Sequence, residues 1–231
     1  MKNLKIAKVR DLLKVTNHEN GEGFAVLQDA VPGITSRYIK PDMLKTSLGE
    51  KIVVRNSVAE KLAVAQQKLS EIYRDYQLHV AYGYRTPEIQ EQSYQRKRQE
   101  LSRPDLSDGE LTEQTHTFVA FPEVAGHPTG GAIDVTLINR LTGKELPMGC
   151  HISDFSKPEL MATFATGLRI TEKENRLLLH NLLKELGFAP FYGEWWHFSY
   201  GDREWAFFYD QPTSLYSPVS LDQLKKTPSL P

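Results

Sequence analysis

The stretch His127-Pro-Thr-Gly-Gly-Ala-Ile-Asp134-Val-Thr-Leu137 joins a glycine-containing loop to a strand that is apolar except for one carboxylate. Successive side chains of a strand point to opposite faces, so Ile133, Val135 and Leu137 share a core face and Asp134 points the other way. A carboxylate that is buried alone is strongly destabilising. Asp134 therefore requires a cation or a full set of hydrogen bonds, unless it lies on the solvent face of an antiparallel sheet.

His127 begins the same stretch, seven residues before Asp134. The proline and the two glycines between them allow the loop to fold back, so that the imidazole approaches the carboxylate. The alternative is an ordinary histidine on a surface loop.

A second informative stretch, Gly193-Glu-Trp-Trp-His197, lies some sixty residues later. His197 is either a metal ligand or a core histidine that is satisfied by a backbone carbonyl. Glu194 raises a geometric question, because residues three apart on a strand point to opposite faces. Gly193 suggests that the chain is still turning there, which would bring Glu194 to the side of His197; otherwise Glu194 pairs with a neighbouring basic residue.

Two histidines and one aspartate make the ligand set of a catalytic zinc site, in which three protein ligands leave one position open. His127, Asp134 and His197 are thus predicted to bind one Zn²⁺ per chain, although such a set also accepts other divalent ions. Glu194, beside the last ligand, is then available as a general base.

Arg85 ends a predicted strand in Ala81-Tyr-Gly-Tyr-Arg-Thr-Pro87. A guanidinium group at that position can anchor a substrate carboxylate or stabilise a developing oxyanion. A surface ion pair with Glu88 is the alternative.

The composition excludes several classes of protein. A net charge of -1 gives no electrostatic reason to expect nucleic acid or an anionic membrane as a partner. No apolar stretch reaches the length of a membrane span, and the N-terminus lacks the apolar region of a secretory signal. Cys150 is the single cysteine, which excludes an internal disulfide and fits a reducing compartment. We expect a cytoplasmic protein; export without a leader is the alternative.

The pattern of helices and strands predicts an α+β fold, a single domain over residues 1–231 with a central antiparallel sheet flanked by helices. Residues 1–50 form an N-terminal extension of short strands and loops, and residues 211–231 form a C-terminal tail. Two capping boxes, Ser57–Glu60 and Thr171–Glu174, mark helix starts. We expect helices at 57–75, 87–101 and 171–186, strands at 78–84, 131–138 and 195–200, and a long surface loop at 102–126.

The arginine motif and the two histidine blocks together resemble the D-alanyl-D-alanine dipeptidases, the VanX-like branch of the zinc D,D-peptidases (family M15, with a Hedgehog-like fold). The resemblance covers roughly residues 55–200, and Glu194-Trp-Trp-His197 is its most specific block. It implies that His127, Asp134 and His197 bind zinc, that Glu194 is the catalytic base, and that Arg85 stabilises the transition state. The implied reaction is hydrolysis of a small D,D-dipeptide, most readily D-Ala-D-Ala.

The sequence departs from the family pattern at two positions that concern substrate recognition. The family usually has serine two residues before the first zinc histidine, where this chain has Ala125. The family segment whose aspartate holds the substrate ammonium reads Met148–Phe155 here, with altered order and length, and Asp154 is the candidate for that role. Trp195 and Trp196 are expected to wall the substrate site or to pack in the core.

Two other functions fit the same motifs. One is a D,D-carboxypeptidase that trims longer cell-wall peptides, which the missing export signal disfavours. The other is a non-catalytic binding domain that zinc stabilises. The presence of both Glu194 and Arg85 favours an enzyme, and the sequence does not determine the oligomeric state.

Overall fold

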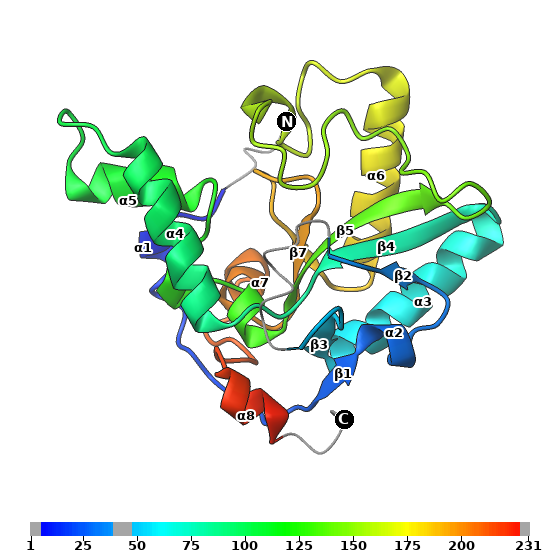
Figure 1. The fold of residues 1–231 in the computed structure, drawn as a ribbon, viewed down its shortest axis with the longest axis horizontal. Coiled ribbons are helices and arrows are strands. Elements are labelled where there is room, and N and C mark those ends of the chain that lie inside the picture. Colours follow the sequence, from blue (N-terminus) through cyan, green and yellow to red (C-terminus); the bar gives the residue numbers. More distant parts are fainter. Residues whose placement is uncertain (1–5, 39–47, 227–231) are drawn as a thin grey trace.

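The computed structural model describes residues 6–38 and 48–226, which form a mixed α+β fold, as predicted. Its centre is a five-stranded sheet with the order β2-β4-β5-β7-β6 (Figure 1). β2 pairs with β4 in parallel, and the other neighbours are antiparallel. The strands of this sheet are β2 (Thr35–Ser36), β4 (Tyr76–Tyr82), β5 (Ala132–Asn139), β6 (Ala189–Pro190) and β7 (His197–Ser199).

A two-stranded antiparallel sheet and helices of varied length complete the described part of the chain. The small sheet pairs β1 (Phe24–Val26) with β3 (Val53–Arg55). The α-helices are α1 (Val9–Leu12), α2 (Leu27–Ala30), α3 (Asn56–Ile72), α4 (Pro87–Leu101), α5 (Asp108–His116), α6 (Ile170–Glu185), α7 (Arg203–Phe208) and α8 (Leu221–Lys225). Short 3-10 helices are η2 (Pro122–Val124), η3 (His127–Thr129) and η4 (Pro158–Leu160).

The predicted alternation of β5 is confirmed. Ile133, Val135 and Leu137 belong to the main hydrophobic core. α3 and α6 pack together against this face of the sheet (Figure 1), where Leu62 and Leu179 are fully buried. On the opposite face of β5, Asp134 lines a hollow together with residues of α4, and Thr136 donates a hydrogen bond to Glu145.

Helix α5 corrects the prediction of a loop over residues 102–126. Ser107 accepts a hydrogen bond from the Glu110 amide, and the Glu110 carboxylate accepts one from the Ser107 amide. This capping box starts a helix that packs on α4. Gly109, which in the sequence favours a loop, lies within this helix.

Two predicted capping boxes are wrong in position. α3 begins at Asn56, and both the amide and the hydroxyl of Ser57 donate to the Glu22 carboxylate, so the cap comes from a distant segment. α6 begins at Ile170, and Glu172 accepts from the amide of Arg169. α4 begins directly after Thr86, whose hydroxyl accepts a hydrogen bond from the Ile89 amide and caps the helix.

The two ends of the described chain lie on the surface of the fold, and both contribute buried side chains. In the predicted tail, Tyr216 and Leu224 are completely buried. Residues 1–5, 39–47 and 227–231 of the predicted extension and tail lie outside the described residues. None of the helices in the described ranges combines the length and the apolar character that a membrane crossing requires.

Gly126 generates a stability prediction, because the fold leaves no room for a side chain there. An added Cβ would overlap the Asp202 carboxylate and would lie 2.9 Å from the Ala132 Cβ. We expect Gly126→Ala to lower the free energy of unfolding by about 1–3 kcal/mol, the usual cost of overpacking, measured by urea denaturation.

Gly109 supplies the matched control, since nothing lies within 4 Å of an added Cβ in α5. Gly109→Ala should leave the free energy of unfolding unchanged or slightly raise it, because alanine favours a helix. Equal effects of the two substitutions would contradict the packing described for Gly126.

Candidate active site

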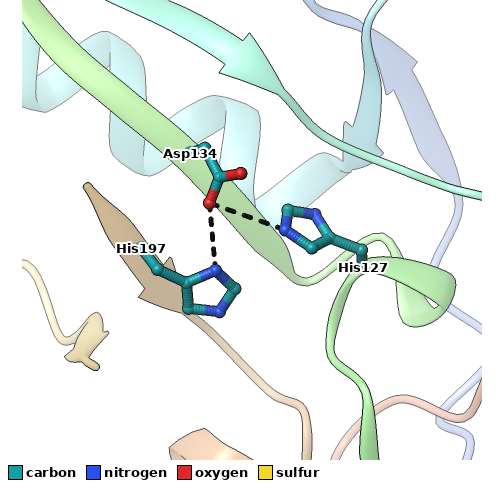
Figure 2. Close-up of side chains that lie close together, drawn as sticks. All are labelled: His127, Asp134 and His197. Atoms are coloured by element: carbon teal, nitrogen blue, oxygen red, sulfur yellow. Dashed lines mark hydrogen bonds and ion pairs between the residues drawn. The ribbon is translucent and has the colours of Figure 1, made fainter. Parts of the chain in front are cut away.

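Three neighbouring strands bring the predicted metal ligands together. In the sheet register, Asp134 of β5 lies opposite His197 of β7 on one side and Tyr82 of β4 on the other. His127 approaches from η3, just before β5. Figure 2 shows both imidazoles directed at one oxygen of the carboxylate: Asp134 Oδ1 lies 3.5 Å from His127 Nε2 and 3.0 Å from His197 Nδ1.

The loop before β5 fixes the orientation of the His127 ring. Its Nδ1 lies 2.8 Å from the carbonyl oxygen of Gly83, which follows β4. Gly130 closes the turn with a φ of 74°, in the left-handed region that favours glycine, and its amide donates to the carbonyl of His127. An Nδ1–H bond to a carbonyl leaves the lone pair on Nε2, the nitrogen that faces Asp134.

Burial determines the charges of the cluster. Asp134 is 4% exposed and His127 is 7% exposed, so neither lies on a solvent face or a surface loop. Although burial favours the neutral carboxyl, the two histidines hold the pKa of Asp134 well below its usual range. Burial lowers the pKa of His127, whereas for His197 it is outweighed by Asp134 and Glu204, which raise its pKa well above the usual value.

These three donor atoms fit a tetrahedral divalent metal. They all lie within 4.8 Å of one another, with the two distances to Asp134 Oδ1 at 3.0 and 3.5 Å. Ligand atoms at the bond lengths of tetrahedral zinc are about 3.3 Å apart. A closed structural site would need a fourth protein ligand, and within the described residues the cluster consists of these three.

Glu194 lies on the same side as the cluster because β7 does not extend back to it. The amide of Glu194 donates to the Phe191 carbonyl and the amide of His197 donates to the Glu194 carbonyl, so the chain turns there. Glu194 thus lines the same hollow as the three ligands. Burial and the negative charge of Asp134 raise the pKa of the Glu194 carboxyl to about 8.

Arg85 lies on the wall of this hollow, just after β4. Its Nη1 donates to the Gln90 side chain at 3.0 Å, and Gln90 in turn donates to the carbonyl of Ala120. The buried Nε of Arg85 has no hydrogen-bond partner among the described residues. The guanidinium group is close enough to Glu194 to lower the pKa of that carboxyl. Arg85 is therefore held by an amide, without the predicted alternative of an ion pair with Glu88.

The hollow has a volume of about 500 Å³, and its walls combine polar groups with aromatic rings. Trp196 lines it, whereas Trp195 is buried against the guanidinium of Arg176. Ser153 and Phe155 also line it. Between them, the Asp154 carboxylate accepts hydrogen bonds from the amide and the hydroxyl of Ser156, so its role in binding substrate stays a prediction.

Sequence reasoning missed two side chains of the hollow, Glu204 and His116. Glu204 Oε2 lies 3.4 Å from His197 Nε2. His116 is buried, and its Nδ1 accepts a hydrogen bond from the Phe121 amide. The acidic residue seven positions after His197 was the available signal for Glu204, but without the fold it could not be distinguished from other acids.

Comparison with known proteins identifies relatives of this chain. It is 28% identical over 182 residues to a D-alanyl-D-alanine dipeptidase of Synechocystis, covering 69% of this chain and 73% of that protein. It is 33% identical over 79 residues to a D-alanyl-D-alanine dipeptidase of Enterococcus faecium, covering 34% of this chain and 38% of that protein.

Among solved structures, the chain is similar to the vancomycin resistance D,D-dipeptidase VanXYg in complex with a D-Ala-D-Ala phosphinate analogue. The TM-score is 0.42 at 18% identity, and the match covers 94% of this chain and 70% of that chain. The model of the family Peptidase_M15, described as D-ala-D-ala dipeptidase, matches residues 23–217. Because this match spans well over half of the sequence, the chain belongs to the D-Ala-D-Ala dipeptidase family of peptidases and is a hydrolase.

Proposed function

We propose that this protein hydrolyses the peptide bond of a small D,D-dipeptide, most readily D-Ala-D-Ala, with one zinc ion per chain. The observation that carries the proposal is the placement of His127, Asp134 and His197 in one hollow with Glu194 and Arg85. Family membership supports the reaction class. A free dipeptide as substrate also fits the proposed cytoplasmic location.

The metal would be held by His127 Nε2, Asp134 Oδ1 and His197 Nδ1, the atoms that converge in Figure 2. When bound, it supplies Lewis-acid activation of water and of the substrate carbonyl. Glu194 accepts the proton of the attacking water and returns it to the leaving amine. A nearby cation lowers the pKa of a carboxyl. Bound metal would therefore lower the pKa of Glu194 from its metal-free value of about 8 towards neutral pH.

Arg85 stabilises the negative charge that develops on the carbonyl oxygen of the substrate. The Gln90 side chain holds the guanidinium group in place, so little reorganisation accompanies the reaction. The free N–H groups of the guanidinium can point into the hollow that Glu194 also lines. In this arrangement Glu194 transfers the proton and Arg85 stabilises the negative charge, so that two different side chains carry the two roles.

A longer substrate is a second candidate, which the size of the hollow favours. At about 500 Å³ it falls within the range of pockets that enclose drug-sized ligands, and its lining includes Phe118, Phe155 and Arg96. A D,D-carboxypeptidase would use the same catalytic groups on a peptide that enters from this side. Comparing D-Ala-D-Ala with N-acetyl-D-Ala-D-Ala separates the two, because only the dipeptidase requires a free amine.

The first prediction concerns the proposed activity and Glu194. The zinc-loaded protein should release D-alanine from D-Ala-D-Ala, with one zinc per chain by elemental analysis. Glu194→Gln preserves the shape of the side chain but cannot accept the proton. We expect it to keep zinc and to lose at least about a hundredfold in kcat.

Glu174→Gln is the matched control, since Glu174 is exposed on α6. It should retain both zinc and turnover. Full turnover by Glu194→Gln would exclude the assigned role, and a wild-type protein that binds zinc but cleaves neither probe peptide would favour a binding domain.

The second prediction concerns Arg85. Arg85→Lys keeps a positive charge but removes the fork that Gln90 orients. We expect a loss of about a hundredfold in kcat with unchanged zinc content, measured in steady-state assays. Arg140→Lys, at an exposed position outside the hollow, should change kcat little. Equal effects of the two substitutions would contradict the role of Arg85.

The third prediction concerns protons that zinc binding displaces. In the metal-free protein, Asp134 and Glu204 raise the pKa of His197, and burial raises the pKa of Glu194 to about 8, so both groups hold their protons more tightly than usual. Zinc binding must remove the His197 proton and favours ionisation of Glu194. The affinity should therefore rise with pH from about 6 to 8.

Calorimetric titration with zinc in buffers of different ionisation enthalpy measures this release. Glu194→Gln should release fewer protons than the wild type at pH 7, because its amide does not titrate. Identical proton release by both proteins would show that the Glu194 carboxyl does not respond to the metal.

A further inference from the structure

Behind His197, on the side away from Asp134, lie two polar side chains that the mechanism does not use. His197 Nε2 is 3.4 Å from Glu204 Oε2 and 3.4 Å from the Ser199 hydroxyl. That hydroxyl also lies 3.3 Å from Glu204 Oε2, as donor to the carboxylate. The side chains of Ser199 and Glu204 therefore contact each other and the Nε2 atom of His197.

We infer that Glu204 is a positioning residue that holds His197 in the tautomer and orientation presenting Nδ1 to the metal, an inference that rests on the proposed function. A neutral imidazole has one N–H group. When the ring proton is on Nε2, where the Glu204 carboxylate and the Ser199 hydroxyl both lie 3.4 Å away, the lone pair is on Nδ1, the atom 3.0 Å from Asp134.

The fold holds the Glu204 carboxylate in place from its own side. Glu204 is in the first turn of α7, whose N-cap is the fully buried Asp202, with Oδ1 accepting from the Trp205 amide at 2.8 Å. The Trp205 indole donates to the carbonyl of Gly187, and Ala206 is completely buried. The start of α7 is therefore anchored at several points, and Glu204 reaches His197 from a rigid segment.

The two histidine rings have outer partners of different chemistry. His127 directs Nδ1 to the Gly83 carbonyl, and its Nε2 faces Asp134. His197 directs Nε2 to the Glu204 carboxylate, and its Nδ1 faces Asp134. A carboxylate partner is charged and makes the ring more electron-donating than a carbonyl does, so loss of Glu204 should weaken metal binding at His197 specifically.

Glu204 also lines the hollow, so a carboxylate that binds the substrate ammonium is the competing role. The two roles differ in what they change. A positioning residue changes the zinc affinity of the protein in the absence of substrate. A substrate ligand changes KM and leaves the zinc affinity alone.

The test is the zinc dissociation constant of the full-length metal-free protein, measured by competition with a chromogenic chelator. Glu204→Ala should bind zinc about 10–100-fold more weakly, the usual effect of losing an outer partner of a metal ligand. Glu204→Gln keeps an oxygen that accepts the Nε2–H and should bind more tightly than Glu204→Ala. Nitrogen NMR of the zinc-bound wild type should show the proton of His197 on Nε2.

Glu123→Ala, at an exposed position of η2, is the matched control and should bind zinc as the wild type does. Circular dichroism checks that each variant is folded. If Glu204→Ala does not fold, Glu204→Gln, which is nearly identical in shape to the wild type, tests the inference in its place. Zinc affinity within twofold of the wild type in both Glu204 variants overturns the inference, as does a raised KM with unchanged zinc affinity. If the wild type binds no zinc, the proposed function fails as well, a result distinct from a failure of Glu204 alone.

Discussion

One buried carboxylate constrains the whole site. Asp134 is 4% exposed in a strand whose other face is the hydrophobic core, and a charge in that position must be compensated. The compensation comes from two imidazoles that approach the same oxygen, one from the loop before β5 and one from the neighbouring strand β7. The turn at Gly130 places His127, and the pairing of β5 with β7 places His197. The contacts at Asp134 Oδ1 therefore depend both on a local turn and on the pairing of distant strands.

The two histidines that contact Asp134 have further partners of their own. Gly83, at the end of β4, orients one ring through its carbonyl, and α7 places an acidic side chain behind the other. On the far face of the sheet, α3 and α6 pack against the strands that bear the ligands (Figure 1). The arrangement of His127, Asp134 and His197 is thus supported both by the helices behind the sheet and by the segments that adjoin the two histidines.

The sequence predicted those parts of the structure that depend on local pattern. Strand alternation placed Asp134 opposite Ile133 and Val135, and the two glycines indicated that His127 folds back. Contacts between distant segments could not be predicted in this way. The orientation of Glu194 depends on where β7 begins, and the position of Glu204 depends on how α7 docks. Even the cap of α3 comes from Glu22, far from Ser57 in the chain.

The same distinction applies to function. Asp134 and His197 lie on paired strands, and His127, Arg85 and Glu194 lie on the segments that directly adjoin strands. Other residues that line the hollow lie on α4 and on the loop around Ser153, and the φ of 56° at Ser153 is unusual for a residue other than glycine. Ala125, where the family usually has serine, is buried, and its neighbour Gly126 lines the hollow. One departure from the family pattern is therefore buried beside the hollow, and the other, Met148–Phe155, contributes Ser153 and Phe155 to its wall.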